Sequence, residues 1–244
     1  MARDRLQAFR EGLSEPERRV LETEQRAASG LLDAHDRPER ILEAAADALS
    51  YGEDFRRHHL QVVQPAEPIA CHDGCHWCCH LSVAASAPEI FRLAQYIREN
   101  TDPATLASIR ARATKLAQDP RIFSPDAKAE AKIPCPVLTS EGSCAAYAAR
   151  PLACRGWNAS DPEACRRALD DETQFIPMNM QLARDCAVVS VGLLGALESA
   201  GLPIDVIELT AGLSIALNEP NALERWLAGE AIFASALAER PSDG

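Results

Sequence analysis

Residues 71–79 read Cys71-His-Asp-Gly-Cys75-His-Trp-Cys78-Cys79, so four cysteines fall within nine residues. A second segment contributes three more, Cys135, Cys144 and Cys154. Thiolates are preferred ligands of zinc and of iron–sulfur clusters, and seven cysteines grouped in this way are too many for ordinary core positions. The pattern predicts one metal site assembled from two segments that are distant in the sequence.

The size and composition of the chain indicate a globular protein. It has 244 residues, 47% of them apolar, which is enough to bury a sizeable core. No run resembles a signal peptide or approaches the roughly 20 apolar residues of a membrane span. We therefore expect a cytoplasmic protein with no membrane partner. In that reducing compartment, nine cysteines indicate metal ligands or redox groups rather than disulfides.

The net charge of −11, from 36 acidic and 25 basic residues, makes nucleic acid an unfavourable partner. The region around the last clustered cysteines is nevertheless basic, with Arg150, Arg155, Arg166 and Arg167. A nucleic acid could use such a patch. The better explanation is that guanidinium groups offset the charge of about −2 that four thiolates on one divalent ion would carry.

Helix signals dominate the chain, and the commonest is a polar cap followed by proline in the first turn. They predict helices that begin near Asp36-Arg-Pro38, Ser86-Ala-Pro88, Thr101-Asp-Pro103, Ser160-Asp-Pro162 and Asn218-Glu-Pro220. Ser86 and Glu89 also form a capping-box pattern. The last helix is expected to run through Trp226 to about Leu237.

Two further apolar helices are predicted near 178–200 and 204–217, separated by Gly201-Leu-Pro203. The run 187–194 is compatible with a short buried strand, but helix-forming residues flank it and favour a helix. Convincing strands are nearly absent. We predict a mainly α-helical single domain in which two irregular cysteine-bearing loops, 64–82 and 133–160, converge on a metal site.

Three regions follow from this reading. Residues 1–63 form N-terminal helices that pack on the core, residues 64–160 form the cysteine-cluster region, and residues 161–244 form C-terminal helices of the same domain. Loops with little regular structure need a cross-link to hold their conformation, and a bound metal would supply one.

The spacing of the cysteines constrains how they bind. Cys75-x2-Cys78 lets two sulfurs hold one ion from a tight turn, and Cys71 is near enough to join them. The neighbours Cys78 and Cys79 have diverging side chains, which suggests that they bind two different metal centres. One zinc ion or one cubane cluster uses four ligands, whereas two tetrahedral ions need eight, or seven if one thiolate bridges.

Other residues leave the ligand set open. Three histidines can complete either arrangement: His72, His76 and His80. Cys165 and Cys186 lie in predicted helices beside small apolar residues, so we interpret them as core or peripheral thiols rather than ligands. A closed four-cysteine zinc site would hold the loops together and do no chemistry.

Two resemblances to known families were weighed. Cys71-x3-Cys75-x2-Cys78 resembles the cluster loop of radical S-adenosylmethionine enzymes, but only over eight residues, and the strand rhythm of their barrel is missing after residue 80. The motif Cys71-x3-Cys75-x2-Cys78-Cys79, with Cys135-Pro-Val-Leu138 and Gly142-Ser-Cys144 through Arg150-Pro-Leu-Ala-Cys154-Arg155, resembles the YkgJ-like cysteine-cluster family of zinc- or iron-chelating domains. This second resemblance covers roughly residues 68–157.

The YkgJ-like resemblance implies metal binding through the seven cysteines. It also singles out Tyr147, Arg150 and Arg155, for which we expect supporting roles as an aromatic wall and two cations around the thiolates, with packing and surface charge as the alternative. A related branch, the flagellin lysine methylases, has a similar cysteine cluster and implies an iron–sulfur cluster used with S-adenosylmethionine to methylate protein lysines. This chain is shorter, and no second cofactor site is evident in it.

Two functional hypotheses follow. The first is a metal-binding protein whose cysteine centre has a structural, redox or metal-handling role. The second is an iron–sulfur-dependent enzyme that modifies a protein substrate, such as a lysine methyltransferase using S-adenosylmethionine. Between zinc and an iron–sulfur cluster we favour iron–sulfur, because the cysteines exceed four and are accompanied by an aromatic residue and arginines.

Overall fold

The computed structural model describes residues 2–33, 37–63, 67–171 and 174–238. It confirms the prediction of a mainly α-helical single domain. The helices are α1 (Ala2–Glu11), α2 (Glu15–Leu32), α3 (Arg37–Val63), α4 (Ala87–Asn100), α5 (Pro103–Leu116), α6 (Pro125–Glu130), α7 (Leu152–Gly156), α8 (Pro162–Asp170), α9 (Met180–Ser199), α10 (Leu209–Asn218) and α11 (Ala222–Leu227). Short 3-10 helices are η1 (Trp77–His80), η2 (Pro120–Phe123), η3 (Tyr147–Ala149) and η4 (Ala234–Ala236).

Local capping determines where several helices begin. The carboxylate of Glu89 accepts hydrogen bonds from Ser86 N at 2.9 Å and from Ser86 Oγ at 2.7 Å, which confirms the capping box at the start of α4. Asp102 accepts from Ala104 N and Thr105 N at the start of α5, and Asp161 accepts from Glu163 N at the start of α8. The cap predicted at Asp36 lies outside the described residues, and α3 begins at Arg37.

The prediction of a last helix from Asn218 to Leu237 is wrong. Asn218 ends α10, and α11 stops at Leu227. Gly229 ends it, with φ of +85°: its N–H bonds to Trp226 O at 3.0 Å, and the N–H of the next residue bonds to Arg225 O at 3.0 Å. These two bonds form a Schellman motif, which satisfies the last carbonyls of a helix and turns the chain away.

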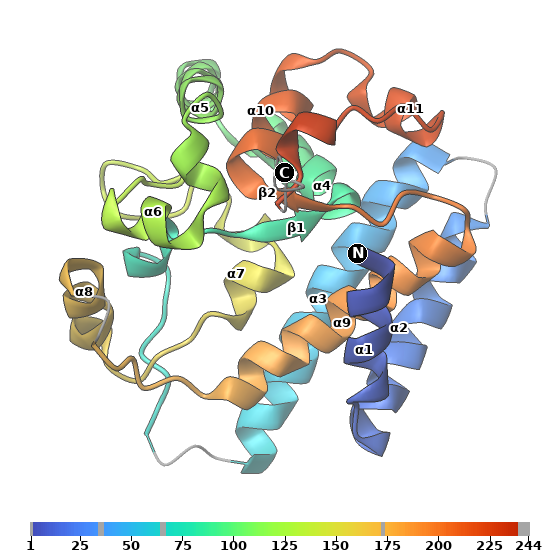
Figure 1. Ribbon diagram of the computed structural model, residues 1–244, viewed down its shortest axis with the longest axis horizontal. Helices are drawn as coiled ribbons and strands as arrows, with labels where there is room; N and C mark the ends of the chain where they lie inside the picture. The colour runs from blue at the N-terminus through green and yellow to red at the C-terminus, as the bar shows by residue number, and fades with distance from the viewer. Residues whose placement is uncertain (1, 34–36, 64–66, 172–173, 239–244) are drawn as a thin grey trace.

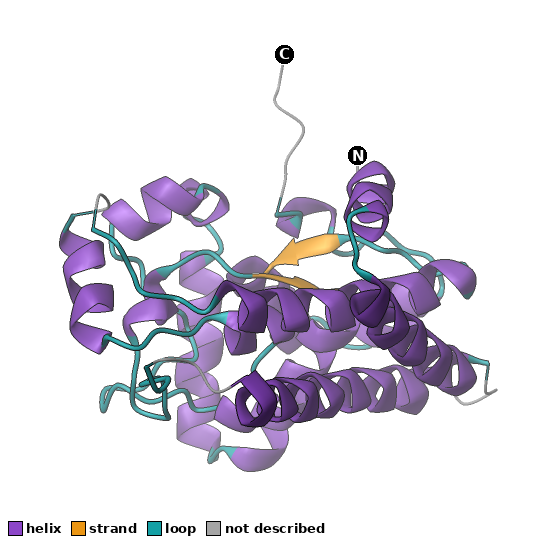
Figure 2. Ribbon diagram, turned by 90° about the horizontal axis from the view of Figure 1, so that it is seen from below, coloured by secondary structure: helices purple, strands orange, loops and turns teal. Residues whose placement is uncertain are grey.

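The structure also contains a small antiparallel sheet, which the sequence did not predict. Strand β1 (Ala84–Ser86) pairs with β2 (Val206–Glu208), with Ala85 opposite Ile207. The helix expected near 204–217 therefore begins later, at Leu209. Figure 2 shows the two strands enclosed among helices.

The core is built around α9, which packs against α2, α3 and α7. Figure 1 shows α2, α3 and α9 side by side on one side of the molecule, with α5, α6 and α8 on the other. The run 187–194 is helical within α9, as predicted. By length and apolar composition α9 could cross a membrane, and 67% of its most apolar window is buried inside the protein.

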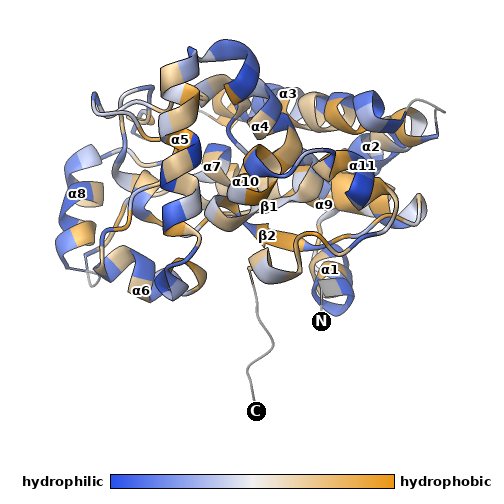
Figure 3. Cartoon of the chain, turned by 90° about the horizontal axis from the view of Figure 1, so that it is seen from above, coloured by the Kyte–Doolittle hydropathy of each residue, from blue (hydrophilic) through white to orange (hydrophobic). Residues whose placement is uncertain are grey.

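The second part of the core joins α4, α10 and the sheet. Phe91 of α4 makes ring contacts with Trp226 and with Phe233, at centroid distances of 6.0 Å and 5.4 Å. Figure 3 shows the hydrophobic colour of β2 in the interior and a largely hydrophilic α8 at the edge of the molecule. The cysteine-bearing segments lie between these two parts, on the side of α6 and α8.

Candidate metal centre

The first cysteine segment is a turn followed by η1. Gly74 has φ of +94°, a conformation that favours glycine, and it allows Cys75 N to bond to His72 O at 3.1 Å. Cys79 N then bonds to His76 O at 2.9 Å within the 3-10 turn. The turn therefore presents Cys75, Cys78 and Cys79 in quick succession.

The second segment is also built from turns. Cys135 lies between two prolines, and its N–H donates to Cys79 O at 2.8 Å, which ties the two segments directly together. Cys144 forms an isolated β-bridge with Leu138 across the turn at Gly142, where φ is +82°. Cys154 lies in the short helix α7 at the edge of this segment.

A third connection joins the first segment to the chain just before α8. Ala70 N donates to Ala159 O at 2.9 Å, and Ala159 N donates to Cys71 Sγ at 3.2 Å. The two predicted loops thus converge.

All seven predicted cysteines meet in this region. Cys71 and Cys75 are hydrogen-bonded through their side chains, and so are Cys78 and Cys79. The thiols of Cys79, Cys144 and Cys154 are each close enough to that of Cys135 for their charges to interact. The structure therefore gathers the predicted donors, while their role as metal ligands stays a prediction.

Backbone groups lie close to several of the sulfurs in a repeated local pattern. The backbone groups of Trp77, Val137 and Ala146 lie close enough to the thiols of Cys75, Cys135 and Cys144, each two residues earlier, to lower the pKa of those thiols. A neutral thiol is a weak acceptor, whereas a thiolate gains strongly from backbone donors. The backbone is therefore arranged to stabilise sulfur in its anionic, metal-binding form.

Burial acts against that anionic form. It raises the pKa of the Cys71, Cys75 and Cys135 thiols, takes that of Cys144 to about 11, and takes that of Cys154 well above its usual value. In the adjacent pair, the hydrogen bond from Cys79 lowers the pKa of Cys78 and raises that of Cys79. Because a bound cation deprotonates thiols and repays the cost of burying their charge, such a group of sulfurs suits a metal.

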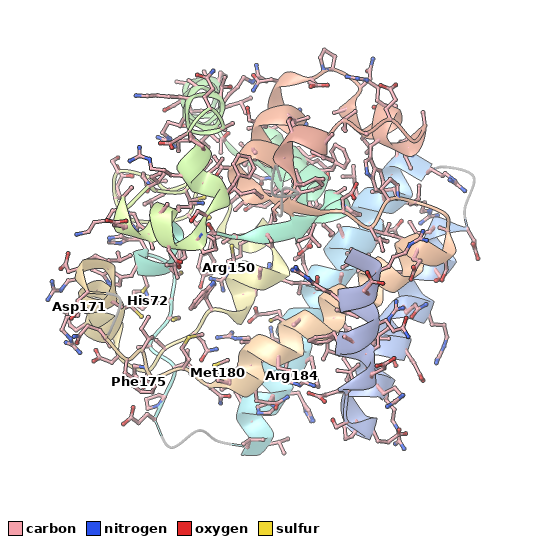
Figure 4. All side chains as sticks on the ribbon, viewed as in Figure 1. His72, Arg150, Asp171, Phe175, Met180 and Arg184 are labelled. Atoms are coloured by element: carbon pink, nitrogen blue, oxygen red, sulfur yellow. The ribbon has the colours of Figure 1, made fainter. Side chains whose placement is uncertain are left out.

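Two half-buried arginines, Arg56 and Arg150, supply positive charge beside the thiols. The guanidinium of Arg150 lies 3.8 Å from the centre of the Tyr147 ring and opposes the rise in pKa of Cys144 and Cys154. Arg56 of α3 does the same for Cys71. In the part of the chain that the structure describes, the Nε atoms of both arginines are buried without a hydrogen-bond partner. Figure 4 shows Arg150 in the region between α7 and α8, on the same side as His72.

These observations fit an anionic metal–thiolate group. The donors are all sulfur, their backbone partners favour thiolates, and two cations with unused donors stand beside them. Within the described residues, no three His, Cys, Asp or Glu side chains form a ready-made ion site. The thiols would therefore have to draw together around a metal.

Arg155 does not face the thiols, contrary to our expectation. Its guanidinium donates to Arg150 O at 3.0 Å, to Ala148 O at 2.5 Å and to Glu53 Oε2 at 3.1 Å. Arg155 therefore fastens the second cysteine segment to α3. Of the predicted supporting residues, Tyr147 and Arg150 lie beside the cluster as expected.

The three histidines make local contacts. His72 Nδ1 lies 2.6 Å from Asp73 O, and His80 Nδ1 lies 3.4 Å from Trp77 O. The ring of His76 packs on that of Trp77 at a centroid distance of 4.5 Å. These contacts hold the turn in shape.

An eighth cysteine joins the cluster. Cys165 lies in α8, which packs against η1, and its thiol is close enough to those of Cys71, Cys75 and Cys78 for their charges to interact. Sequence reasoning had treated it as a core or peripheral thiol. The number of cysteines was the sequence signal that could have identified Cys165 as a donor, because an eighth cysteine allows two sets of four. Cys186, by contrast, is a core residue as expected, with 1% of its surface exposed.

Comparison with known proteins supports the same interpretation. Residues 70–183 match the family model CxxCxxCC, described as "Putative zinc- or iron-chelating domain". The matched residues make up a little under half of the chain. The CxxCxxCC domain contains all eight clustered cysteines, although three residues rather than two separate Cys71 from Cys75.

The family match confirms the resemblance to a cysteine-cluster family and identifies a metal-binding protein. The CxxCxxCC domain begins after α3 and ends within α9, so it includes both cysteine segments and α8. A similarity to flagellin lysine methylases is not shown. Comparisons with curated proteins and with solved structures gave no match.

Proposed function

We propose that this protein holds iron as an iron–sulfur centre in its cysteine cluster, and that the centre serves a redox or metal-handling role while it staples the two cysteine segments. The observation that carries the proposal is the set of backbone groups beside the sulfurs. The N–H of Ala159 contacts Cys71 Sγ at 3.2 Å, and nearby backbone groups favour the thiolate forms of Cys75, Cys135 and Cys144. Hydrogen bonds to cluster sulfurs are among the features that set the potential of iron–sulfur centres.

Iron–sulfur is favoured over zinc by the residues that lie beside the thiols. The number of thiols is compatible with either metal, since one zinc ion and one cubane cluster each use four ligands. Arg150 and Tyr147 lie against the cluster, where a cation offsets negative charge and an aromatic ring limits access of water. Both features would tune a redox centre. The methyltransferase alternative rests on resemblance alone, and the proposal does not extend to it.

Anaerobic purification followed by metal analysis and visible spectroscopy tests the proposal. The expected protein is brown and contains iron and acid-labile sulfide, and Cys75→Ser loses most of that iron. Cys186→Ser is the matched control, because Cys186 is buried in the core away from the cluster, and it should keep the iron. A colourless protein with stoichiometric zinc would show that the cluster binds zinc and not iron. A protein with neither metal would overturn the proposal.

A further inference from the structure

We propose that the eight clustered cysteines form two separate four-thiolate centres. An outer centre uses Cys71, Cys75, Cys78 and Cys165, and an inner centre uses Cys79, Cys135, Cys144 and Cys154. This division rests on the proposed metal-binding function, and it assigns every thiol of the cluster to one of two sites.

The adjacent cysteines in η1 are where the two centres part. A 3-10 helix has about three residues per turn, so the side chains of neighbouring residues leave the helix axis roughly 120° apart. The Cys78 and Cys79 thiols contact each other here, but two adjacent residues are poorly placed to bind one tetrahedral ion together. The Cys79 thiol has Cys135 and Cys144 as its further thiol neighbours, on the side of the second segment. Cys78 also lies close enough to Cys135 and Cys154 for their charges to interact. It is assigned to the outer centre because it forms the tight-turn pair with Cys75, and Cys165 is close to both.

The outer centre is completed by the connection to α8. The bonds from Ala70 N to Ala159 O and from Ala159 N to Cys71 Sγ fix the chain just before this helix. The helix begins at Pro162, and Cys165 follows in its first turn, over η1. The thiols that act on Cys165 are Cys71, Cys75 and Cys78, which are the other members of the outer set.

The inner centre is anchored to the hydrophobic core. The bond from Cys135 N to Cys79 O at 2.8 Å joins the first segment to the second. Three of the inner four, Cys135, Cys144 and Cys154, pack against the main core cluster, whereas in the described residues Cys79 and the outer four are not part of that packing. The inner centre is therefore shielded, and the outer centre lies nearer to solvent.

Each centre has its own cation. Arg56 acts on Cys71 of the outer set, and Arg150 acts on Cys144 and Cys154 of the inner set, with Cys78 within its reach as well. Four thiolates on a divalent ion carry a charge of about −2, so two centres side by side need more than one counter-charge. Arg150 and Arg56 are half-buried, and the Nε atom of each is buried without a hydrogen-bond partner among the described residues, although Arg56 also pairs with Glu53 at 3.3 Å. The two arginines meet that need.

Zinc titration of the reduced full-length protein tests the division. With Zn²⁺ as the probe, we expect about two ions per chain, and about one ion in each of Cys165→Ser and Cys144→Ser. Competition with a chelator should remove zinc from the wild-type protein in two phases. Cys165→Ser should lack the fast phase, and Cys144→Ser should lack the slow one. Cys186→Ser should keep both.

Three results would overturn the division. They are one Zn²⁺ per chain in the wild type, an unchanged count in Cys165→Ser, and loss of both ions in Cys165→Ser with helix content retained by circular dichroism. Cys165→Ala replaces the serine variant if that variant fails to fold, since alanine is well tolerated in a helix. Absence of any metal binding would instead remove the proposed function itself, so the two failures are distinguishable.

Discussion

A buried carboxyl group in the helical bundle should make the protein less stable as the pH rises. Glu24 of α2 is 2% exposed, and it faces Gly192 of α9, where an added Cβ would lie 2.8 Å from Glu24 Cβ. Its Oε1 has no hydrogen-bond partner among the described residues. Burial, with a smaller contribution from the charge of Asp47, raises the pKa of Glu24 from 4.5 to about 7.

The sign of the effect follows from proton binding. Between pH 4.5 and about 7 the folded protein keeps the Glu24 proton, whereas the unfolded chain has released it. The folded state then binds more protons, so the free energy of unfolding falls as the pH rises through this window. At about 1.4 kcal/mol per pH unit, the total loss is about 3 kcal/mol as an upper bound.

Urea unfolding at several pH values from 5 to 8 measures this loss. The variant Glu24→Gln has no ionisable group at this position, so its advantage over the wild type should grow by up to about 3 kcal/mol across the range. The control is Glu22→Gln, an exposed carboxyl on the same helix, which should follow the wild-type pH profile. A constant difference between Glu24→Gln and the wild type from pH 5 to pH 8 would refute the reasoning.

Further predictions concern the cysteine cluster and two buried polar contacts. Arg150→Met should weaken zinc binding about tenfold while Arg150→Lys retains part of it, and equal affinity in both variants would contradict the role of the charge. Glu89→Ala removes the acceptor of Ser86 N and of Leu152 N, so urea unfolding should show a loss of about 2–4 kcal/mol, unlike an exposed substitution such as Glu99→Ala. Lys128→Met leaves the buried carboxylate of Glu208 without its partner at 3.1 Å and should cost about 3 kcal/mol, and a loss below about 1 kcal/mol would argue against a charged pair.

The parts of the fold that could be predicted from sequence are those determined by neighbouring residues. In the caps at Ser86, Asp102 and Asp161, the carboxylate of Glu89, Asp102 or Asp161 accepts from a backbone N–H two or three residues away, so the signal is contained in a short window. The pairing of β1 with β2 is different, because it joins residues more than a hundred positions apart. Three-residue strands carry too little alternation to reveal such a contact.

The candidate site also has some features that neighbouring residues determine and others that depend on distant contacts. Cysteine spacing predicted the seven clustered thiols, and the backbone bonds between the segments bring them together. The position of Cys165 depends on how α8 packs over η1, and the direction of Arg155 depends on an acceptor in α3. Neither is encoded in nearby residues, so sequence reasoning placed Cys165 outside the cluster and Arg155 inside it.

The adjacent cysteines Cys78 and Cys79 connect the corrected role of Cys165 with that of Arg155. Cys78 and Cys79 are the least suitable pair for a single tetrahedral ion, so two adjacent thiols in one short turn imply two destinations. Seven thiols cannot fill two four-ligand sites without a bridge, and Cys165 removes that difficulty by adding the eighth donor beside Cys78. With Arg155 turned toward Glu53, the proposed inner centre has Arg150 as its nearby cation and the proposed outer centre has Arg56. In the two-centre proposal, a helix that lies outside the two predicted loops therefore sets the number of metals that the protein holds.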